Sequence, residues 1–241
     1  MERNIELVMA PCLYKYHSKG GVVVLIDVAR FTTTMITALA NGAVSAEAYP
    51  NSDIPLRLKA EQGYVLSGEN RGCDIPGFDF NNSPLSMTPE NVSGRKLAFT
   101  TTNGTYTRSL IDNYDKIFAG AFVNASALVK RLIAENKDVK LVCSGRGRRA
   151  AVEDTIFAGY IAKRLIEEGG FVSYDDSVYI GMVLYEQAKG NLLDFVLKNS
   201  PTVNIMCGRY PLYKNDLDTV FVLDKYDIVP EEVSPLKFEV R

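Results

Sequence analysis

Histidine and tryptophan are the residues that this 241-residue sequence most lacks, with one of the first and none of the second. The single histidine, His17, stands beside Ser18, Lys19 and two glycines in a predicted loop. A metal site built from several histidines is therefore excluded, and a Ser–His–Asp hydrolase would have to use this one residue. No GxSxG motif, which carries the nucleophile in many such hydrolases, is present. Acid, base and metal-ligand chemistry must therefore fall mainly to carboxylates.

Cysteine is also scarce and is spread widely, at positions 12, 73, 143 and 207 with no CxxC pair. This spacing fits neither a structural zinc cluster nor a dense disulfide framework. Cys143 ends an apolar run and is predicted to be a buried thiol.

Neither a charge excess nor a long apolar run is present. The chain has 27 basic and 29 acidic residues, a net charge of −2, which argues against nucleic acid or an anionic membrane as the main partner. The charged start MERNIELVMA lacks the apolar core of a signal peptide, and no run approaches membrane-spanning length. We therefore expect a cytoplasmic protein. With 46% hydrophobic residues, the chain can bury the core of one large domain or two small ones.

What the sequence does contain is an alternation of apolar β-rich runs with helical patterns. The runs predict strands at 22–27, 43–49, 64–69, 96–100, 116–122 and 139–144, and helices at 32–43, 54–63, 103–111, 126–136 and 152–169. Two further helices are predicted at 177–189 and 192–198, followed by a strand over TVFVLD, 219–224, and a polar tail. This alternation predicts an α/β fold with a mostly parallel sheet.

Residues 69–94 interrupt the alternation with a long segment rich in Gly, Pro, Asn and Asp. Structureless segments of this length are uncommon in compact domains and are usually functional or disordered. Its aromatic residues and Ile75 favour an ordered functional loop.

Four predicted strands end in polar clusters that use the same residue types: acids, arginines, hydroxyls and glycines. Ligands of open parallel sheets bind outside the carboxyl ends of the strands, so these positions are candidates for one site. The clusters hold Asp27, Arg30 and Thr32–Thr34 after the first strand, Glu69 and Arg71 after the third, Thr100–Thr105 after the fourth, and Ser144, Arg146, Arg148 and Arg149 with Glu153 and Asp154 after the sixth.

This set of residue types fits a phosphate ester held with a hard cation. Phosphate oxygens need N–H groups, hydroxyls and guanidinium groups around them. Carboxylates alone would repel them unless a cation such as Mg²⁺, which prefers oxygen ligands, lies between. In TTNGT, the residues Thr101, Thr102, Asn103 and Thr105 could donate to an anion, while Gly104 allows close approach at a helix N-terminus.

Each cluster also has a purely structural interpretation. Thr and Asn before a helix are ordinary N-caps, and Asp27 could cap the next helix in the same way. Glu153 and Asp154 fall in a first helical turn, where acids favour the macrodipole. Arg146, Arg148 and Arg149 could form a solvated basic loop. The recurrence of such clusters at successive strand ends favours the functional interpretation.

Taken in order, four stretches of the sequence resemble the 2-phosphosulfolactate phosphatase family, the ComB-like proteins of coenzyme M biosynthesis. They are VVVLIDVARFTTTMITALANGA, LSGENRGCDIPGFDFNNSP, TTTNGTYT and CSGRGRRAAVED, and the run DLDTVFVLDKYDIVP is similar to the family's ending. The resemblance implies one α/β/α unit over residues 1–241, with a subdomain boundary near 135–140 as an alternative. It also implies a Mg²⁺-dependent acid phosphatase and a small phosphorylated acid as substrate; a homodimer is one option for its assembly.

The resemblance also implies a site, carried over position by position. Its members would be Asp27 and Glu69 in catalysis, Asp27, Glu153 and Asp154 at the metal, and Arg30, Arg71, Thr101, Thr102, Asn103, Gly104, Thr105 and Arg149 at the phosphate and substrate. Two positions depart from the family: Asn70 stands where Arg is usual, and Ala151 where Ser is frequent. Both departures concern the part of the substrate beyond the phosphate.

Three hypotheses about function follow. The first is hydrolysis of 2-phosphosulfolactate to sulfolactate and phosphate; the second is a phosphatase for another phosphorylated 2-hydroxy acid. The third is a non-catalytic protein that binds a phosphometabolite, which the acids argue against because a pure phosphate binder gains nothing from them. Direct attack by water is favoured over an aspartyl-phosphate, since Asp27 lacks a DxD spacing.

Overall fold

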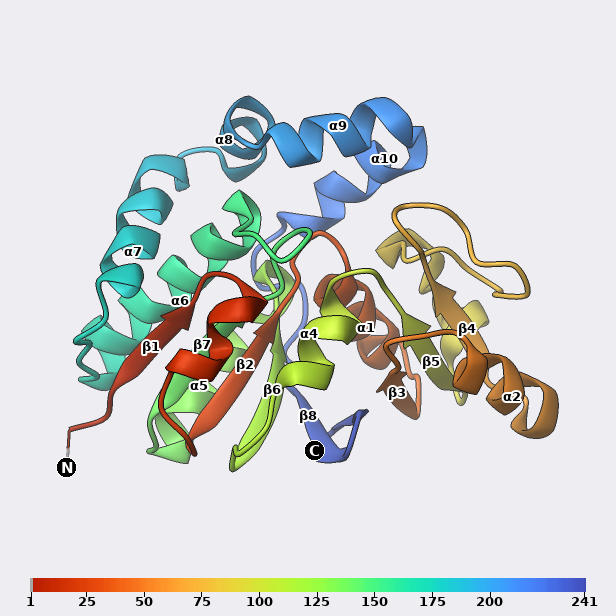
Figure 1. Ribbon diagram of the computed structural model, residues 1–241, viewed down its shortest axis with the longest axis horizontal. Coiled ribbons are helices and arrows are strands. Elements are labelled where there is room, and N and C mark those ends of the chain that lie inside the picture. Colours follow the sequence, from red (N-terminus) through yellow and green to blue (C-terminus); the bar gives the residue numbers. More distant parts are fainter. Residues whose placement is uncertain (1) are drawn as a thin grey trace.

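A nine-stranded sheet forms the centre of the molecule in the computed structural model, which describes residues 2–241 (Figure 1). The strands are β1 (Ile5–Val8), β2 (Val22–Ile26), β3 (Ser45–Ala48), β4 (Val65–Gly68), β5 (Lys96–Thr100), β6 (Lys116–Gly120), β7 (Val139–Cys143), β8 (Pro230–Ser234) and β9 (Lys237–Val240). Their order is β1-β7-β2-β6-β8-β9-β3-β5-β4. All pairings are parallel except those of β8 and β9, so the predicted α/β fold with a mostly parallel sheet is confirmed.

The sheet consists of two parallel halves joined by an antiparallel hairpin. In the larger half, Val24 of β2 pairs with Phe118 of β6 on one side and with Leu141 of β7 on the other. The hairpin β8–β9 carries an irregularity between Glu232 and Ser234 and meets β6 at a single register pair. The two halves of the sheet are therefore joined through few paired residues.

The helices cover both faces of the sheet and complete three layers. They are α1 (Phe31–Ala40), α2 (Asp53–Gln62), α3 (Pro89–Val92), α4 (Gly104–Leu110), α5 (Ala125–Glu135), α6 (Val152–Gly169), α7 (Asp176–Ala188), α8 (Leu192–Asn199), α9 (Pro201–Arg209) and α10 (Pro211–Val220), with short 3₁₀ helices at 11–16, 84–86 and 122–124. Within residues 2–241, no helix combines the length and the apolarity that crossing a membrane requires.

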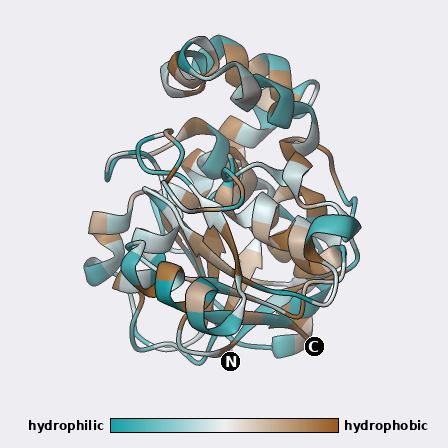
Figure 2. Ribbon diagram, turned by 90° about the vertical axis from the view of Figure 1, so that its right-hand side faces the viewer, coloured by the Kyte–Doolittle hydropathy of each residue, from teal (hydrophilic) through white to brown (hydrophobic). Residues whose placement is uncertain are grey.

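Strand β2 shows how the sequence produces these layers. Val22, Val24 and Ile26 face a core shared with α5 and α6, while Val23 and Leu25 face a second core shared with α1. All five are fully buried, because a parallel strand covered on both faces needs apolar residues at successive positions rather than at every second one. Figure 2 shows the same pattern, with hydrophobic residues along the central strands and hydrophilic ones on peripheral helices and loops.

The C-terminal part of the chain differs from the prediction. The strand predicted at 219–224 is wrong, because residues 211–220 form α10. Tyr213, Leu217 and Val220 are buried apolar residues of this helix, at the i, i+4, i+7 spacing of a helix face. The short run TVFV does not distinguish strand from helix by itself. Strand β1, helix α9 and the hairpin β8–β9 were not predicted, and the prediction of a boundary near residues 135–140 stays a prediction.

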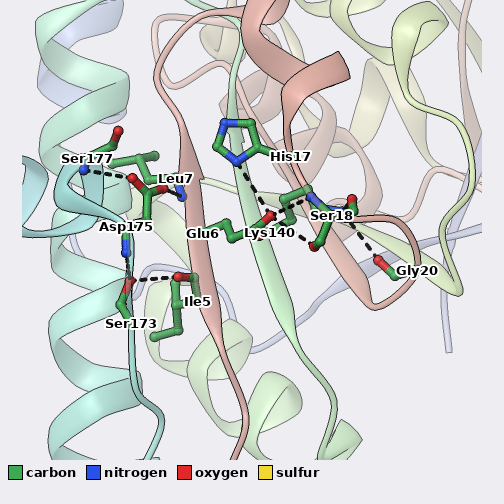
Figure 3. Close-up of polar contacts among 10 residues, drawn as sticks. All are labelled: Ile5, Glu6, Leu7, His17, Ser18, Gly20, Lys140, Ser173, Asp175 and Ser177. Atoms are coloured by element: carbon green, nitrogen blue, oxygen red, sulfur yellow. Dashed lines mark hydrogen bonds and ion pairs between the residues drawn. The ribbon is translucent and has the colours of Figure 1, made fainter.

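The start of α7 is fastened to the edge strand β1 (Figure 3). Asp175 accepts hydrogen bonds from the backbone N–H groups of Leu7 and Ser177, both at 2.8 Å. Ser173 Oγ donates to the carbonyl of Ile5 at 2.7 Å. These contacts occupy backbone groups that an edge strand would otherwise expose, and they fix where the last four helices begin.

After α7, the helices α8, α9 and α10 extend over the sheet at the top of Figure 1. We call these three helices, residues 192–220, the arch. The arch is divided by side-chain N-caps: Asn191 accepts from the N–H of Asp194, and Ser200 from the N–H of Val203. Pro201 and Pro211 occupy the first positions of α9 and α10. The arch therefore bends at set residues and returns toward the strand ends.

Candidate active site

A cavity of about 360 Å³ lies between the carboxyl ends of the strands and the arch. Four carboxylates and four arginines line it: Asp27, Glu69, Glu153 and Asp154, and Arg30, Arg71, Arg146 and Arg209. Neutral lining residues are Ala29, Gly72, Asn82, Thr102, Asn103, Gly145, Gly147, Thr202, Met206 and Tyr213. The cavity thus combines residues from both half-sheets, the 69–94 loop and the arch.

We call the three buried acids Asp27, Glu153 and Asp154, which line the cavity, its floor. Asp154, in the first turn of α6, accepts hydrogen bonds from the N–H groups of Val28 and Gly145, one on each carboxylate oxygen and both at 2.9 Å. It therefore ties together the loops that follow β2 and β7. Asp27 accepts a longer hydrogen bond from the N–H of Phe31, at 3.3 Å.

Burial raises the pKa values of the floor acids, and neighbouring carboxylates add to the effect at Asp27 and Asp154. Burial, with smaller effects from Glu69 and Glu153, raises the pKa of Asp27 from 3.8 to about 7. Burial also raises the pKa of Glu153, and burial together with Asp27 and Glu153 raises the pKa of Asp154 well above its usual range. Such mutual destabilisation of buried charges is what a bound cation would relieve.

Glu69 is held by the TTNGT loop. One of its oxygens accepts from the N–H of Thr102 at 2.7 Å, and the other accepts from Thr102 Oγ1 at 2.9 Å and from the N–H of Gly72 at 2.5 Å. The N–H of Arg71 donates in turn to Thr102 Oγ1 at 2.6 Å. Both the backbone N–H and the hydroxyl of Thr102 therefore donate to Glu69 and hold its carboxylate at the cavity wall.

Three other members of the loop lie behind the cavity and do not line it. Thr101 and Thr105 are buried and cap each other, since the N–H of each donates to the hydroxyl of the other. A Cβ on Gly104 would lie 2.6 Å from Asp27 Oδ2 and even closer to the ring of Phe31, so only glycine fits there. These three residues support the loop that carries Thr102 and Asn103, and their predicted contact with phosphate stays a prediction.

Asn103 does line the cavity and connects two loops. Its Oδ1 accepts a hydrogen bond from the N–H of Gly147 at 3.1 Å. The loops that follow β5 and β7 are therefore joined at the cavity wall.

Arg30 is buried and already paired. Its guanidinium donates to Asp216 of α10 at 2.5 Å and to Asn81 at 2.8 Å, and lies over the ring of Tyr213. Asp216 also accepts from Ser83 Oγ at 2.5 Å. Arg30 thus joins the strand-end loop, the 69–94 loop and the arch.

The other three cavity arginines have no carboxylate partner, since no ion pair among residues 2–241 includes Arg71, Arg146 or Arg209. Arg146 donates to the carbonyl of Thr202 at 3.1 Å, which brings α9 against the loop after β7. These guanidinium groups are the cavity's available cations.

Arg149, predicted to bind phosphate, is exposed and lies outside the cavity. Residues 146–149 form a closed turn in which Arg146 and Arg149 exchange backbone hydrogen bonds of 2.9 and 3.0 Å. The turn brings Arg146 to the cavity and not Arg149. Of the basic run, Arg146 lines the cavity and Arg149 does not; the role of Arg149 at the phosphate stays a prediction.

His17 also lies away from the cavity. Its Nδ1 is 3.4 Å from Glu6, beside Ser18 (Figure 3). The cavity is therefore lined by carboxylates and not by the single histidine, as the sequence indicated.

Several lining residues were not predicted. Arg209, Tyr213, Thr202 and Met206 come from α9 and α10, which had no clear sequence pattern. Asn82 comes from the irregular loop, where the general expectation of function gave no particular residue. Arg146 was noted in the sequence only as one of three basic loop residues.

The side chain of Asn82 leaves a polar atom of the cavity lining available to a ligand. It is 3% exposed, and its buried Oδ1 has no hydrogen-bond partner; Ser144 Oγ, beside Gly145, is in the same condition. Unpartnered buried polar atoms are rare in folded proteins. Among residues 2–241, however, no three His, Cys, Asp or Glu side chains already form a metal-binding cluster.

Comparison with known proteins shows similarity to one family over most of the chain. A family model described as 2-phosphosulpholactate phosphatase matches residues 9–235. A protein of Caldanaerobacter subterraneus subsp. tengcongensis is 33% identical over 221 residues, which cover 87% of this chain and 86% of the relative. One from Carboxydothermus hydrogenoformans is 35% identical over 222 residues, with 89% and 87% covered. One from Clostridium beijerinckii is 29% identical over 233 residues, with 93% and 94% covered. All three are described as probable 2-phosphosulfolactate phosphatases.

Proposed function

Because the chain belongs to the 2-phosphosulpholactate phosphatase family, we propose that it hydrolyses 2-phosphosulfolactate to sulfolactate and phosphate with the help of Mg²⁺. This activity would place it in coenzyme M biosynthesis. The observation that carries the proposal is the cavity in which four carboxylates face four arginines. Arginines alone would suit any phosphate binder, whereas buried acids beside them suit a cation placed against a phosphoryl group.

The residues of the cavity floor fit a magnesium ion. Asp27, Glu153 and Asp154 supply hard oxygen atoms, and their raised pKa values reflect a charge that a cation would compensate. The lack of a ready-made three-acid cluster is compatible with Mg²⁺, which usually takes one or two carboxylates and completes its shell with water and substrate oxygens. Bound there, Mg²⁺ would withdraw charge from the phosphoryl oxygens.

The chain's own residues then have distinct roles. Arg71 and Arg146 would bind phosphoryl oxygens, since neither is neutralised by a carboxylate of the described chain and guanidinium groups match phosphate geometry. Asp27, which lines the cavity beside this site, would also take a proton from the attacking water. Glu69, held by three hydrogen bonds, would accept the water's other hydrogen and orient the lone pair.

In the proposed reaction, the water oxygen forms a bond to phosphorus while the bond between phosphorus and the ester oxygen of the substrate breaks. The leaving alkoxide takes up a proton from solvent, and Asp27 afterwards releases the proton of the attacking water to solvent, so the net reaction consumes one water. An aspartyl-phosphate on Asp27 is the alternative route, and retention of configuration at an isotopically chiral phosphorus would reveal it, because a single direct attack by water inverts that centre.

The test is phosphate release from 2-phosphosulfolactate, 2-phospholactate and 2-phosphoglycolate, each measured with Mg²⁺ and with EDTA. We expect release that depends on Mg²⁺ and is fastest with 2-phosphosulfolactate. Full activity in EDTA would refute the metal role. A faster reaction with another substrate would indicate a phosphatase for a different 2-phospho acid. Thermal stabilisation by these compounds without phosphate release would indicate a binding protein.

A further inference from the structure

A second cavity of about 490 Å³ adjoins the first, between the 69–94 loop and α10. The two cavities share Arg30, Gly72, Arg209 and Tyr213 as lining residues. A ligand that places one end against the floor acids can therefore extend its other end toward the second cavity.

The charged residues of the second cavity are engaged within the protein, with one exception. Asp216 accepts from Arg30 and from Ser83, and Asp74 accepts from Asn81 Nδ2 at 2.5 Å. Arg30 spends its two terminal nitrogens on Asp216 and Asn81. Arg209 is the charged lining residue that has neither an ion pair nor a side-chain hydrogen bond within residues 2–241.

Arg209 is also held in place at the junction. It is the last residue of α9, and two tyrosines that follow it form hydrogen bonds to loops that line the cavity. Tyr210 Oη donates to the carbonyl of Arg71 at 3.1 Å, and a Cβ on Gly72 would lie 2.5 Å from the Tyr210 ring. Tyr213 Oη donates to the carbonyl of Ala29 at 3.4 Å. These contacts fix the backbone at Arg209 before a ligand arrives, and the exposed guanidinium keeps its donors available.

We infer that Arg209 is a specificity-determining residue that binds a carboxylate or sulfonate on the carbon skeleton of the phosphomonoester. The inference rests on the proposed function, because that places the phosphoryl group beside Arg71, Arg146 and the floor acids. The acid group at the other end of a small substrate then lies nearest the shared wall of the two cavities. A guanidinium there binds an oxyanion through charge-assisted hydrogen bonds and gives a neutral group no such contact.

The experiment compares three phosphomonoesters that differ only in their acid groups. Isopropyl phosphate has none, 2-phospholactate adds a carboxylate, and 2-phosphosulfolactate adds both a carboxylate and a sulfonate. We expect Arg209→Ala to lower kcat/KM for the acidic substrates by about 10- to 100-fold, mainly through KM, and to leave isopropyl phosphate unchanged. Arg209→Lys should recover part of the loss, since it keeps the charge without the planar fork. Arg57→Ala, an exposed arginine of α2 outside both cavities, is the matched control.

The outcomes separate the alternatives. Loss with both acidic substrates identifies the carboxylate as the bound group, and loss with 2-phosphosulfolactate alone identifies the sulfonate; either supports the inference. An equal loss with all three compounds, or no loss with any, overturns it. If the wild-type protein releases no phosphate, the proposed function fails. Calorimetric binding of the same compounds to the same variants then decides: selective weakening of the acidic ligands supports the inference, and equal affinities overturn it.

Discussion

The floor and the arch side of the cavity are built in different ways. On the floor, Asp27 and Asp154 accept hydrogen bonds from backbone N–H groups and are buried. On the arch side, Arg209 is exposed and has no ion-pair partner in residues 2–241. The next residue, Tyr210, is hydrogen-bonded to the backbone of Arg71 in the 69–94 loop. Acids fixed by the backbone keep one geometry, as a metal and a reacting water require. Arginines without a carboxylate partner can donate hydrogen bonds to a negatively charged group of the ligand.

This contrast predicts that changes on the floor act on kcat and changes on the arch side act on KM. The floor meets atoms whose charge changes during the reaction, while the arch side meets parts of the substrate that stay unchanged. The following variants test that division.

The largest effect is expected for Asp27→Asn, which keeps the shape of the side chain and removes its charge and basicity. We expect kcat for phosphate release to fall by about 10²- to 10⁴-fold, the usual contribution of a positioned base. Asp53→Asn, an exposed acid at the start of α2, is the control and should leave kcat unchanged. An Asp27→Asn protein with wild-type kcat would remove Asp27 from the mechanism.

A pair of glycines compares the two regions directly. A Cβ at Gly104 would meet both the Asp27 carboxylate and the Phe31 ring, whereas at Gly208 in α9 it would meet nothing within 4 Å. Gly104→Ala should lower kcat by about 10²-fold through displacement of Asp27, and destabilise the protein by about 1–3 kcal/mol. Gly208→Ala should leave kcat unchanged and stabilise α9 by about 0.5–1 kcal/mol. Steady-state kinetics and urea denaturation measure both, and similar effects at the two positions would contradict the contrast.

Asp216 links the two regions, because it belongs to the arch and holds Arg30. Removing its carboxylate leaves the buried Arg30 guanidinium without its ion-pair partner. We expect Asp216→Ala to lower the free energy of unfolding by about 3–5 kcal/mol, as for other broken buried pairs, and to raise KM by about 10-fold. Asp218→Ala changes an exposed acid on the same helix and should alter stability by no more than about 0.5 kcal/mol. Equal unfolding curves for the two variants would show that the Arg30 pair contributes nothing.

The same contrast explains what the sequence could predict. Asp27 directly follows the buried run VVVLI, and Glu153 and Asp154 open a long amphipathic helix, so their places at strand ends and helix starts were predictable. Arg209 and Asp216 lie on helices whose position depends on contacts with residues about 100 or more positions away. No local pattern records such contacts.

The threonines of the TTNGT loop teach a related lesson. Their residue types predicted hydrogen-bond donors at this strand end, and donors are present. The direction of each donor was not predictable, because Thr101 and Thr105 cap each other and Thr102 donates to a carboxylate from another strand end. Composition therefore predicted the chemistry of the loop, and tertiary packing decided its partners.

The smallest expected effect is a pH dependence of stability that belongs to the floor alone. The pKa of Asp27 rises from 3.8 to about 7 in the folded protein, so the folded state binds this proton more tightly than the unfolded state. Its stabilising contribution is complete below about pH 4 and is lost as the pH rises through about 7. In EDTA, the wild-type protein should therefore lose more thermal stability between pH 5.5 and pH 8 than Asp27→Asn, which cannot titrate there. Mg²⁺ added at pH 8 should restore the wild-type Tm, since an ion that binds only the folded state stabilises it. Parallel Tm curves for the two proteins in EDTA would show that Asp27 is not strained by its buried surroundings, and the floor would then lack the electrostatic reason to recruit a cation.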